Sequence, residues 1–300
     1  MRVIILPQRS SIQGRSAAVI FYREWQSGSG IVLPGESGNR VIISSERDEV
    51  SLALGRRLLQ LYNFSQIQGS LGTNFIYKNF VLIFIKEIHL NFSNINSIDS
   101  LFPDLHDVVV LSRHSSGANV KSMTVHPTGN PGEAMLGGLS GKLSMSDPQM
   151  MCSTLRLLKS EAPGFGYEVT LEATHHGPLS HLPMHYAEIG VVDDKWKSDE
   201  ILDTLLKSVV GAAPSRGKNY VGVGGGHYMP KVTSHVLSGE ENVGHMLTKR
   251  VVPSIEILAQ SVEKTPECKG FIVDRKGTNG ETRRIIREIC EVRNLELVII

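Results

Sequence analysis

The stretch YEVTLEATHH, residues 167 to 176, resembles a buried β-strand that ends in two adjacent histidines. Alternation along a strand would place Glu172 and His176 on one face and His175 on the other. A carboxylate in a strand that is covered on both faces needs a partner, because an isolated buried charge is costly. Glu172 is therefore the acid in this chain that most needs an explanation.

Short β-rich runs alternate with longer segments of helical period around this stretch, which is typical of an α/β protein. Helices are predicted at 48–62, 147–160, 198–210 and 281–292, and the first three open with an acid or a serine at a capping position. No repeat or linker divides the chain, so we interpret residues 1–300 as a single domain. Strands are predicted at 2–6, 40–44, 80–85, 107–112, 122–126, 167–173, 187–192, 220–223, 270–273 and 295–300.

Composition limits the function classes that are open to the chain. Its 300 residues carry a formal charge of +1, so there is no global basic field for non-specific nucleic-acid binding, and any RNA contact must use local clusters such as Lys249 with Arg250. Three widely separated cysteines without a CxxC pattern argue against a disulfide framework. No apolar run is long enough for a signal peptide or a bilayer span. We expect a soluble, cytoplasmic monomer with no membrane or DNA partner.

Four of the predicted strands end in a histidine. His114 follows DVVVLSR, His126 closes SMTV, His175 and His176 follow YEVTLEAT, and His227 follows YVGVGGG. Ligands of open α/β sheets bind outside the carboxyl ends of the strands, so we expect these side chains to share one crevice at that edge. Several histidines on separate loops are compatible with zinc, whose catalytic sites take three protein ligands and leave a position for water.

Simpler interpretations exist for the same residues. A lone histidine at a strand end is more often a hydrogen-bonded structural residue than a ligand, and His89, His106, His235 and His245 have no supporting context. His181 and His185 are predicted to be surface or packing residues. The glycine run GVGGGH lacks the full GxGxxG spacing, so it is either a tight turn or a bare backbone whose amides can face an anion.

The motifs SRHSS (112–116), TVHPTGN (124–130), LEATHHGP (171–178) and VGVGGGHYMP (221–230) occur in this order. Together they resemble the D-aminoacyl-tRNA deacylase family of the archaeal and plant type. The resemblance implies hydrolysis of the ester that joins a D-amino acid to the 3′ end of tRNA, and an association with zinc. It also implies a three-layer α/β/α fold with a mixed, mostly parallel sheet, of the phosphorylase and peptidyl-tRNA hydrolase sort.

This resemblance suggests roles for the residues already singled out. Hydrolysis of an activated ester needs a positioned water, a base and donors for the oxyanion, and Glu172 or His175 would serve as the base. Zinc would be held among His114, His126, His176 and His227. The acceptor end of the D-aminoacyl-tRNA would be contacted by Thr174, by the amides of Gly224, Gly225 and Gly226, and by Arg113 and Lys231.

Two other classes of protein stay open at this point. A zinc-dependent amidase or exopeptidase on a similar sheet would use the same histidines on peptides. A non-catalytic RNA-binding protein would carry them as structural residues. Neither explains the four motifs together.

Overall fold

The computed structural model describes residues 38–300 except 103, 115–119, 163, 165 and 250–252. The strand predicted at 2–6 lies outside the described residues. No helix among the described residues is both long enough and apolar enough to cross a membrane.

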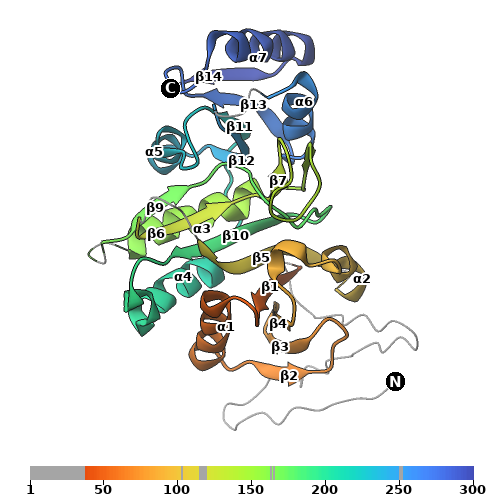
Figure 1. The fold of residues 1–300 in the computed structure, drawn as a ribbon, viewed down its shortest axis with the longest axis vertical. Coiled ribbons are helices and arrows are strands. Elements are labelled where there is room, and N and C mark those ends of the chain that lie inside the picture. The colour runs from red at the N-terminus through yellow and green to blue at the C-terminus, as the bar shows by residue number, and fades with distance from the viewer. Residues whose placement is uncertain (1–37, 103, 115–119, 163, 165, 250–252) are drawn as a thin grey trace, which may run out of the picture.

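A mixed, mostly parallel sheet of eight strands forms the centre of the molecule, in the order β2-β3-β4-β1-β5-β10-β6-β9 (Figure 1). β1 is parallel to β4 and to β5, β5 is parallel to β10, and β6 is parallel to β9. β2 and β3 form antiparallel pairs at one edge, and β10 is antiparallel to β6. The strands are β1 (Asn39–Ser45), β2 (Ser65–Ile67), β3 (Thr73–Tyr77), β4 (Phe80–Ile85), β5 (Leu105–His114), β6 (Ser122–His126), β9 (Glu168–Leu171) and β10 (Met184–Gly190).

Helices cover both faces of this sheet, which makes the three layers that were predicted. Three long helices pack on one face, where their apolar side chains meet Val109 and Leu111 of β5: α1 (Glu49–Leu61), α3 (Pro148–Glu161) and α4 (Asp199–Gly211). Part of the opposite face, with Val108 and Val110, is covered by the short helices η1 (His89–Asn91), η2 (Ile95–Ser97) and α2 (Ile98–Leu101). The 3₁₀ turn η3 (Asp194–Lys197) leads into α4.

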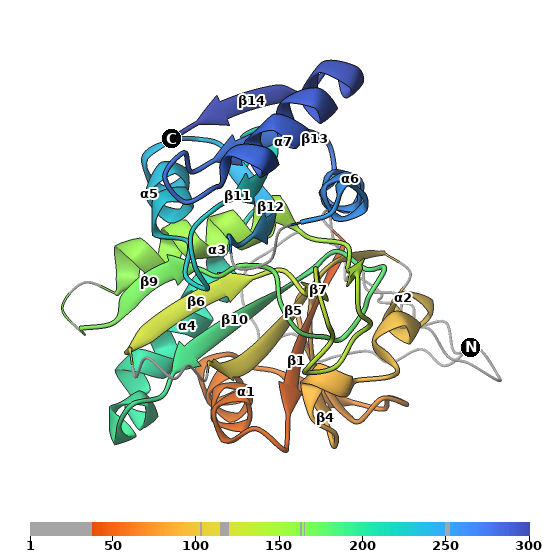
Figure 2. The same cartoon turned by 45° about the horizontal axis from the view of Figure 1, so that its top comes forward.

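A second, all-parallel sheet in the order β12-β11-β13-β14 lies beside the first (Figures 1 and 2). No linker in the sequence predicts this second sheet. Tyr220 and Met246 of this sheet belong to the same apolar core as Leu155 of α3, so the two sheets share a core. A short hairpin, β7 (Gly129–Asn130) with β8 (Lys142–Leu143), completes the strands described. The second sheet contains β11 (Asn219–Val223), β12 (Asn242–Leu247), β13 (Cys268–Val273) and β14 (Glu296–Ile299), with helices α5 (Pro230–Ser238), α6 (Ile255–Glu263) and α7 (Gly280–Arg293).

The four predicted helices begin within one residue of their predicted positions. Asp48, Asp147 and Ser198 each accept a hydrogen bond from an amide of the first turn of their helix, which satisfies donors that have no partner within the helix. The strand predicted at 187–192 is in fact β10, which begins three residues earlier, at Met184, and ends at Gly190. The strand predicted at 167–173 ends earlier, at Leu171, so the chain leaves the ladder before its two histidines.

Candidate active site

Polar and ionisable side chains gather on the sheet face opposite α1, α3 and α4. On each central strand the alternate positions that face away from these helices are polar near one end: His114 on β5, His126 on β6, Glu188 on β10, and Glu172 just after β9. Glu172 and Glu188 are almost fully buried, with 0% and 2% of their surface exposed. The four strands therefore deliver two carboxylates and two imidazoles to one buried place.

The cluster does not lie at the carboxyl edge of the sheet, and in this respect the prediction was wrong. β5 runs parallel to β10 and β6 runs antiparallel to it, so the ends of β5 and β6 point in opposite directions. His114 lies opposite Gly190, whereas His126 lies opposite Tyr186, four residues back along β10. Glu188 lies between these two positions, and its carboxylate is 3.3 Å from His114 Nδ1 and 3.5 Å from His126 Nε2.

Glu172 is held between two imidazoles. His114 Nδ1 lies 3.0 Å from Oε1, and His227 Nε2 lies 3.0 Å from Oε2. Although these distances are short, the contacts are not aligned as hydrogen bonds, and both carboxylate oxygens are without an aligned donor among the described residues. His114 is fixed from behind by the hydroxyl of Tyr228, 2.9 Å from its Nε2.

His126, His175 and His176 form the other half of the cluster, with ring centres 4.2 to 4.9 Å apart. Each ring turns Nδ1 to a backbone carbonyl oxygen: that of Pro127 at 3.1 Å, of Ala173 at 2.8 Å and of Gly177 at 2.7 Å, respectively. A carbonyl can only accept, so each Nδ1 carries a proton. His175 and His176 in their neutral form therefore keep the lone pair at Nε2, whereas for His126 burial acts to lower the pKa but Glu188 outweighs it and raises this pKa. The Nε2 of His126 is buried and makes no hydrogen bond to the described residues, although Glu188 Oε1 lies 3.5 Å away.

His175 does not point away from the site, contrary to the alternation argument. β9 ends at Leu171, and His176 adopts a φ of +44°, in the left-handed region that non-glycine residues seldom occupy. This bend brings both neighbouring histidines to the cluster, and His175 Nε2 lies 3.7 Å from Glu172 Oε2. Backbone strain of this kind is often found at functional sites.

The electrostatics separate the cluster into neutral and charged members. Burial lowers the pKa of His175 to about 3, with a further contribution from His126, and burial likewise holds the pKa of His176 well below its ordinary value. Burial acts to raise the pKa of Glu172, but His114 and His227 outweigh it and hold this pKa well below its usual range. Burial opposes the charged form of His114, yet Glu172 and Glu188 raise its pKa to about 11. Ionised carboxylates therefore lie beside imidazoles that keep their lone pairs.

Three groups of three described residues in the cluster could hold a metal ion, and two of them contain at least two histidines; the third is His126 with Glu172 and Glu188. One ligand atom from each of His126, His175 and His176 lies within 4.8 Å of the others, and the same holds for His114, Glu172 and His227. Neighbouring ligands of a tetrahedral zinc ion, with bonds of about 2.0–2.1 Å, are roughly 3.3 Å apart, so a modest contraction would complete either group. Histidine ligands of metals commonly donate their other N–H to a carbonyl, as the first group does.

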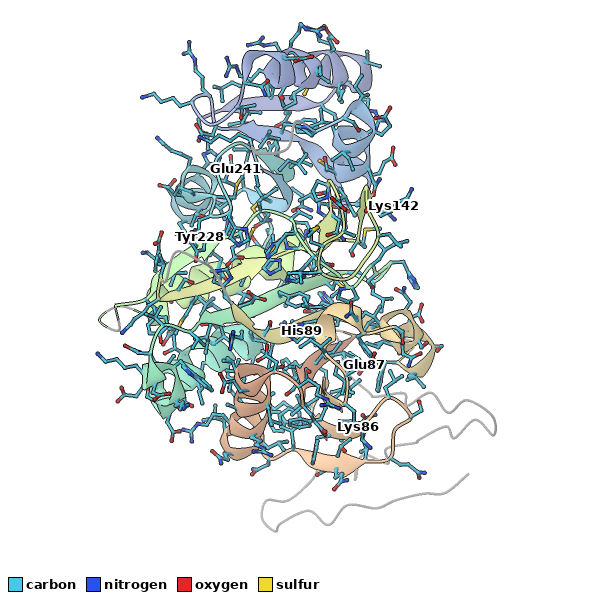
Figure 3. All side chains as sticks on the ribbon, viewed as in Figure 1. Lys86, Glu87, His89, Lys142, Tyr228 and Glu241 are labelled. Atoms are coloured by element: carbon cyan, nitrogen blue, oxygen red, sulfur yellow. The ribbon has the colours of Figure 1, made fainter. Side chains whose placement is uncertain are left out.

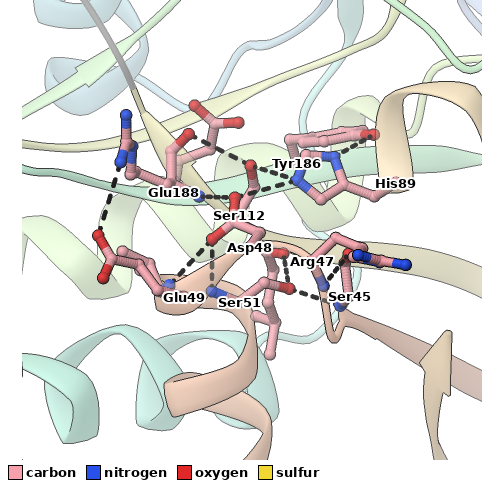
Figure 4. A network of polar contacts seen from close by, with 12 residues as sticks. Ser45, Arg47, Asp48, Glu49, Ser51, His89, Ser112, Tyr186 and Glu188 are labelled. Carbon is pink, nitrogen blue, oxygen red and sulfur yellow. Dashed lines mark hydrogen bonds and ion pairs between the residues drawn. The ribbon is translucent and has the colours of Figure 1, made fainter. Parts of the chain in front are cut away.

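Glu188 is the residue of this site that sequence reasoning missed. It interrupts the run YAEIGVV just as Glu172 interrupts YEVTLEA, so the same argument about a buried carboxylate could have found it. Tyr186, two residues earlier on the same face, stacks on His126 with ring centres 5.2 Å apart. Its hydroxyl donates to the carbonyl oxygen of Gly177 and lies 3.3 Å from His89 Nδ1, and His89 contacts Asp48 in turn (Figure 4).

The predicted glycine donors do not serve the cluster in the way expected. The amide of Gly224 donates to the carbonyl of Leu247, and that of Gly225 donates to the carbonyl of Gly277, so neither is free for an oxyanion. Gly226 belongs to the turn that leads from β11 to His227.

The other predicted substrate contacts also lie apart from the histidines. Thr174 is buried, and its hydroxyl lies 3.1 Å from His245 Nδ1, where it helps to join the two sheets. Arg113 projects to the face that carries α1 and pairs with Glu49 at 3.5 Å. Lys231 is exposed on α5.

Comparison with known proteins shows the family and the fold of the chain. Residues 101–298 match the family model described as D-aminoacyl-tRNA deacylase. The D-aminoacyl-tRNA deacylase of Thermoplasma acidophilum is 39% identical over 263 residues, which cover 87% of this chain and 99% of the relative. That of Pyrococcus abyssi is 30% identical and covers 86% and 99%. The crystal structure of AF0625, a conserved protein of unknown function, superimposes with a TM-score of 0.79 at 28% identity, over 87% of this chain and 95% of that one.

The three-layer fold and the family match together define a hydrolase of α/β architecture. The chain belongs to the D-aminoacyl-tRNA deacylase family, and it is a hydrolase of the ester bond of D-aminoacyl-tRNA.

Proposed function

We propose that the chain removes D-amino acids from tRNA at the histidine cluster, with a zinc ion held by His126, His175 and His176 and with Glu172 as the base. The observation that carries this proposal is the fixed orientation of the three rings, because each donates its Nδ1–H to a backbone carbonyl and leaves Nε2 as the ligand atom. Of the histidines first considered as ligands, His114 and His227 instead flank Glu172.

A zinc ion and the residues present would together supply the base, the activated water and the polarised carbonyl that ester hydrolysis needs. A zinc ion at this place would acidify water and polarise the ester carbonyl. Glu172, ionised and 3.7 Å from His175 Nε2, accepts a proton from the attacking water. The bond between the carbonyl carbon and the 3′ oxygen of the terminal ribose then breaks, and the proton passes to that oxygen. The products are the free D-amino acid and tRNA with a free 3′ hydroxyl.

His114 and His227 position the base in this scheme. Each ring nitrogen lies 3.0 Å from one oxygen of Glu172, so the carboxylate cannot rotate without losing one of the two contacts. Glu188 faces His114 and His126, and it links the base to the histidine group. We further propose that the enzyme acts as a monomer in the cytoplasm, on the acceptor end of its tRNA, which agrees with its three free cysteines.

The deciding experiment compares D-tyrosyl-tRNA with L-tyrosyl-tRNA before and after treatment with a chelator. We expect cleavage of the D-ester to be much faster, to be lost with the chelator and to return with added zinc. Chelator-resistant cleavage of the D-ester would discard the zinc ion and leave Glu172 and His175 as direct acid and base. Equal rates on both enantiomers would overturn selection of the D-ester, and activity on peptides alone would favour the amidase.

A pair of variants tests the metal ligands in the same assay. His176→Ala should lower the zinc content, whereas His181→Ala should not, because His181 is exposed and contacts Asp99 at the surface. Unchanged zinc in His176→Ala would exclude His176 as a ligand. Tight binding of tRNA without cleavage, in protein with zinc restored, would support the non-catalytic alternative.

A further inference from the structure

A small hollow opens at the carboxyl ends of β11 and β12, against the first turn of α7. It belongs to the second sheet and does not include the histidine cluster. In the order β12-β11-β13-β14, the chain passes from β11 to β12 on one side and later returns to β13 on the other side of β11. The hollow therefore lies at a switch point of a parallel sheet, where α/β proteins bind their ligands.

The start of α7 borders this hollow through Asn279 and Thr282. α7 is 14 residues long, and the first amides of a helix have no partner within the helix. Asn279 caps one of them, the amide of Thr282, at 2.8 Å. The helix dipole adds partial positive charge at this end.

A buried hydroxyl in the same turn has no partner. Thr282 is 2% exposed and lines the hollow, yet its Oγ1 finds no hydrogen-bond partner among the described residues. The hydroxyl of Thr278 is already used, because it donates to the carbonyl of Val223. A buried hydroxyl without a partner costs free energy, so its position calls for a ligand that can accept from it.

The backbone at Gly224 keeps the hollow open. This glycine has a φ of +115°, and a Cβ added to it would lie 2.6 Å from Thr278 Oγ1 and 2.9 Å from the Cβ of Asp274. A side chain at this position would therefore clash with the wall of the hollow. In the sequence, the amides of this glycine run make it a candidate anion site. In the structure Gly224 contributes to the hollow by lacking a side chain, since its amide already donates to the carbonyl of Leu247.

The rim of the hollow is basic. Lys249 lines it and is exposed, and Arg275 and Lys276 lie on the loop between β13 and α7. Arg283 is fixed over the start of the helix by bonds from its guanidinium to the carbonyl oxygens of Arg275 and Thr278. Asp274 directs Oδ1 to the amide of Lys276, at 3.0 Å.

We propose that this hollow binds a backbone phosphate of the tRNA at the positive end of α7, with Thr282 Oγ1 and Lys249 as donors. The identity of the RNA rests on the proposed function. The phosphate belongs near the acceptor end, because the hollow and the active site share one turn: Gly224 lines the hollow and His227 contacts Glu172. Three residues of extended chain span at most about 11 Å, so a phosphate held here lies close to the ester.

The test measures the affinity of uncharged tRNA for Lys249→Gln and Thr282→Val as a function of salt. We expect Lys249→Gln to weaken binding about fivefold at 0.1 M salt and to lower the salt slope by about one. Thr282→Val keeps the shape of the side chain and should weaken binding about threefold, because one hydrogen bond is lost. Lys86→Gln is the matched control, since Lys86 is exposed at the opposite end of the molecule from α7 (Figures 1 and 3).

Each outcome decides the proposal. Wild-type affinity and slope in both variants would overturn it. If inorganic phosphate or adenosine 5′-monophosphate protects the hollow while tRNA affinity is unchanged in both variants, the site serves a small phosphate ligand and the assignment to tRNA is wrong. Because the assay uses uncharged tRNA, failure to cleave the D-ester would refute the proposed function without deciding this site.

Discussion

Glu172 is the side chain on which the proposed reaction most depends. It is fully buried, ionised, and contacted by an imidazole at each carboxylate oxygen. A buried charge is tolerated only where partners compensate for the lost hydration. Here His114, which is itself held charged by Glu172 and Glu188, supplies that compensation. The same contacts fix the direction in which the carboxylate can take a proton.

Replacing this base should separate binding from chemistry. Glu172→Gln keeps the shape of the side chain but cannot accept the proton, so we expect single-turnover cleavage of D-tyrosyl-tRNA to fall ~100-fold or more. The affinity for uncharged tRNA should stay unchanged. Glu241→Gln is the control, because Glu241 contacts His235 at 3.8 Å, away from the cluster (Figure 3). Near-normal turnover in Glu172→Gln would remove this residue from the mechanism.

The sequence predicts which side chains lie together in the cluster. It does not predict that His114 and His227 flank Glu172 while His126, His175 and His176 form a separate group. His114, His126, His176 and His227 do converge with Glu172, as strand ends and motif spacing indicated. The position of His175 depends on a left-handed residue just beyond the strand, and no alternation rule includes such a bend.

Among the elements, helices with strong caps are the most predictable. α3 and α4 fall within one residue of their predicted bounds, because an acid or serine cap precedes a clear apolar period. β12 was missed because Gly244 and His245 break its apolar run, although its whole length is buried. α5 was missed because it is short and opens at Pro230, which resembles a turn in the sequence.

The cap of α3 should make stability depend on pH. Burial, and next the charge of Asp107, raise the pKa of Asp147 from its ordinary 3.8 to about 7. Between these values the folded protein holds a proton that the unfolded chain has released, so the free energy of unfolding falls as pH rises from about 4 to about 7. Asp147→Asn keeps the cap and has no charge to bury. It should be more stable than wild type at pH 8, by more than about 1 kcal/mol, and lose this advantage near pH 4.

Urea unfolding at pH 4.5 and at pH 8 measures this difference. Asp48→Asn should give the opposite sign, but only in a comparison that extends below its ordinary pKa of 3.8. Burial acts against the charged form of Asp48, but His89 and backbone donors lower its pKa below the ordinary value. Its contribution is therefore present above the unfolded pKa and is lost as pH falls through the folded pKa. A difference between wild type and Asp147→Asn that does not change with pH would show that Asp147 is ionised in the folded protein.

For the whole molecule, the sequence predicts the layered α/β architecture, but it does not predict how the strands pair or how the two sheets are joined. Period and resemblance predict the layers and the mixed sheet, but the reversal of β6 against β10 is set by tertiary pairing, for which no local signal exists. The sequence likewise does not predict a separate second sheet, because its strands have the same apolar pattern as the buried strands of the first sheet. Its attachment depends on α3, whose Cys152 lies against the backbone of Val243 in β12.

Arg156 of α3 is the polar part of this attachment. Its guanidinium donates to the carbonyl oxygens of Val236 and Glu241 and to the side chain of Asn242, all in or beside α5 and β12. Leu155 and Leu158 of the same helix lie in the core of the main sheet. One helix therefore packs into one sheet and hydrogen-bonds to the other.

This arrangement predicts that the two sheets unfold together and that Arg156 matters to both. Urea unfolding followed by far-UV circular dichroism should coincide with the fluorescence of Trp196, which packs against the main sheet, in a Trp25→Phe background. Arg156→Met leaves several acceptors unpaired and should cost about 2 kcal/mol in the free energy of unfolding. Arg57→Met is the matched control: its ion pairs with Asp199 and Asp203 lie near the surface, so its cost should stay below about 1 kcal/mol. If instead circular dichroism and Trp196 fluorescence give different unfolding midpoints in wild-type protein, the second sheet unfolds as an independent unit. If both arginine variants lower the free energy of unfolding equally, Arg156 of α3 does not join the two sheets.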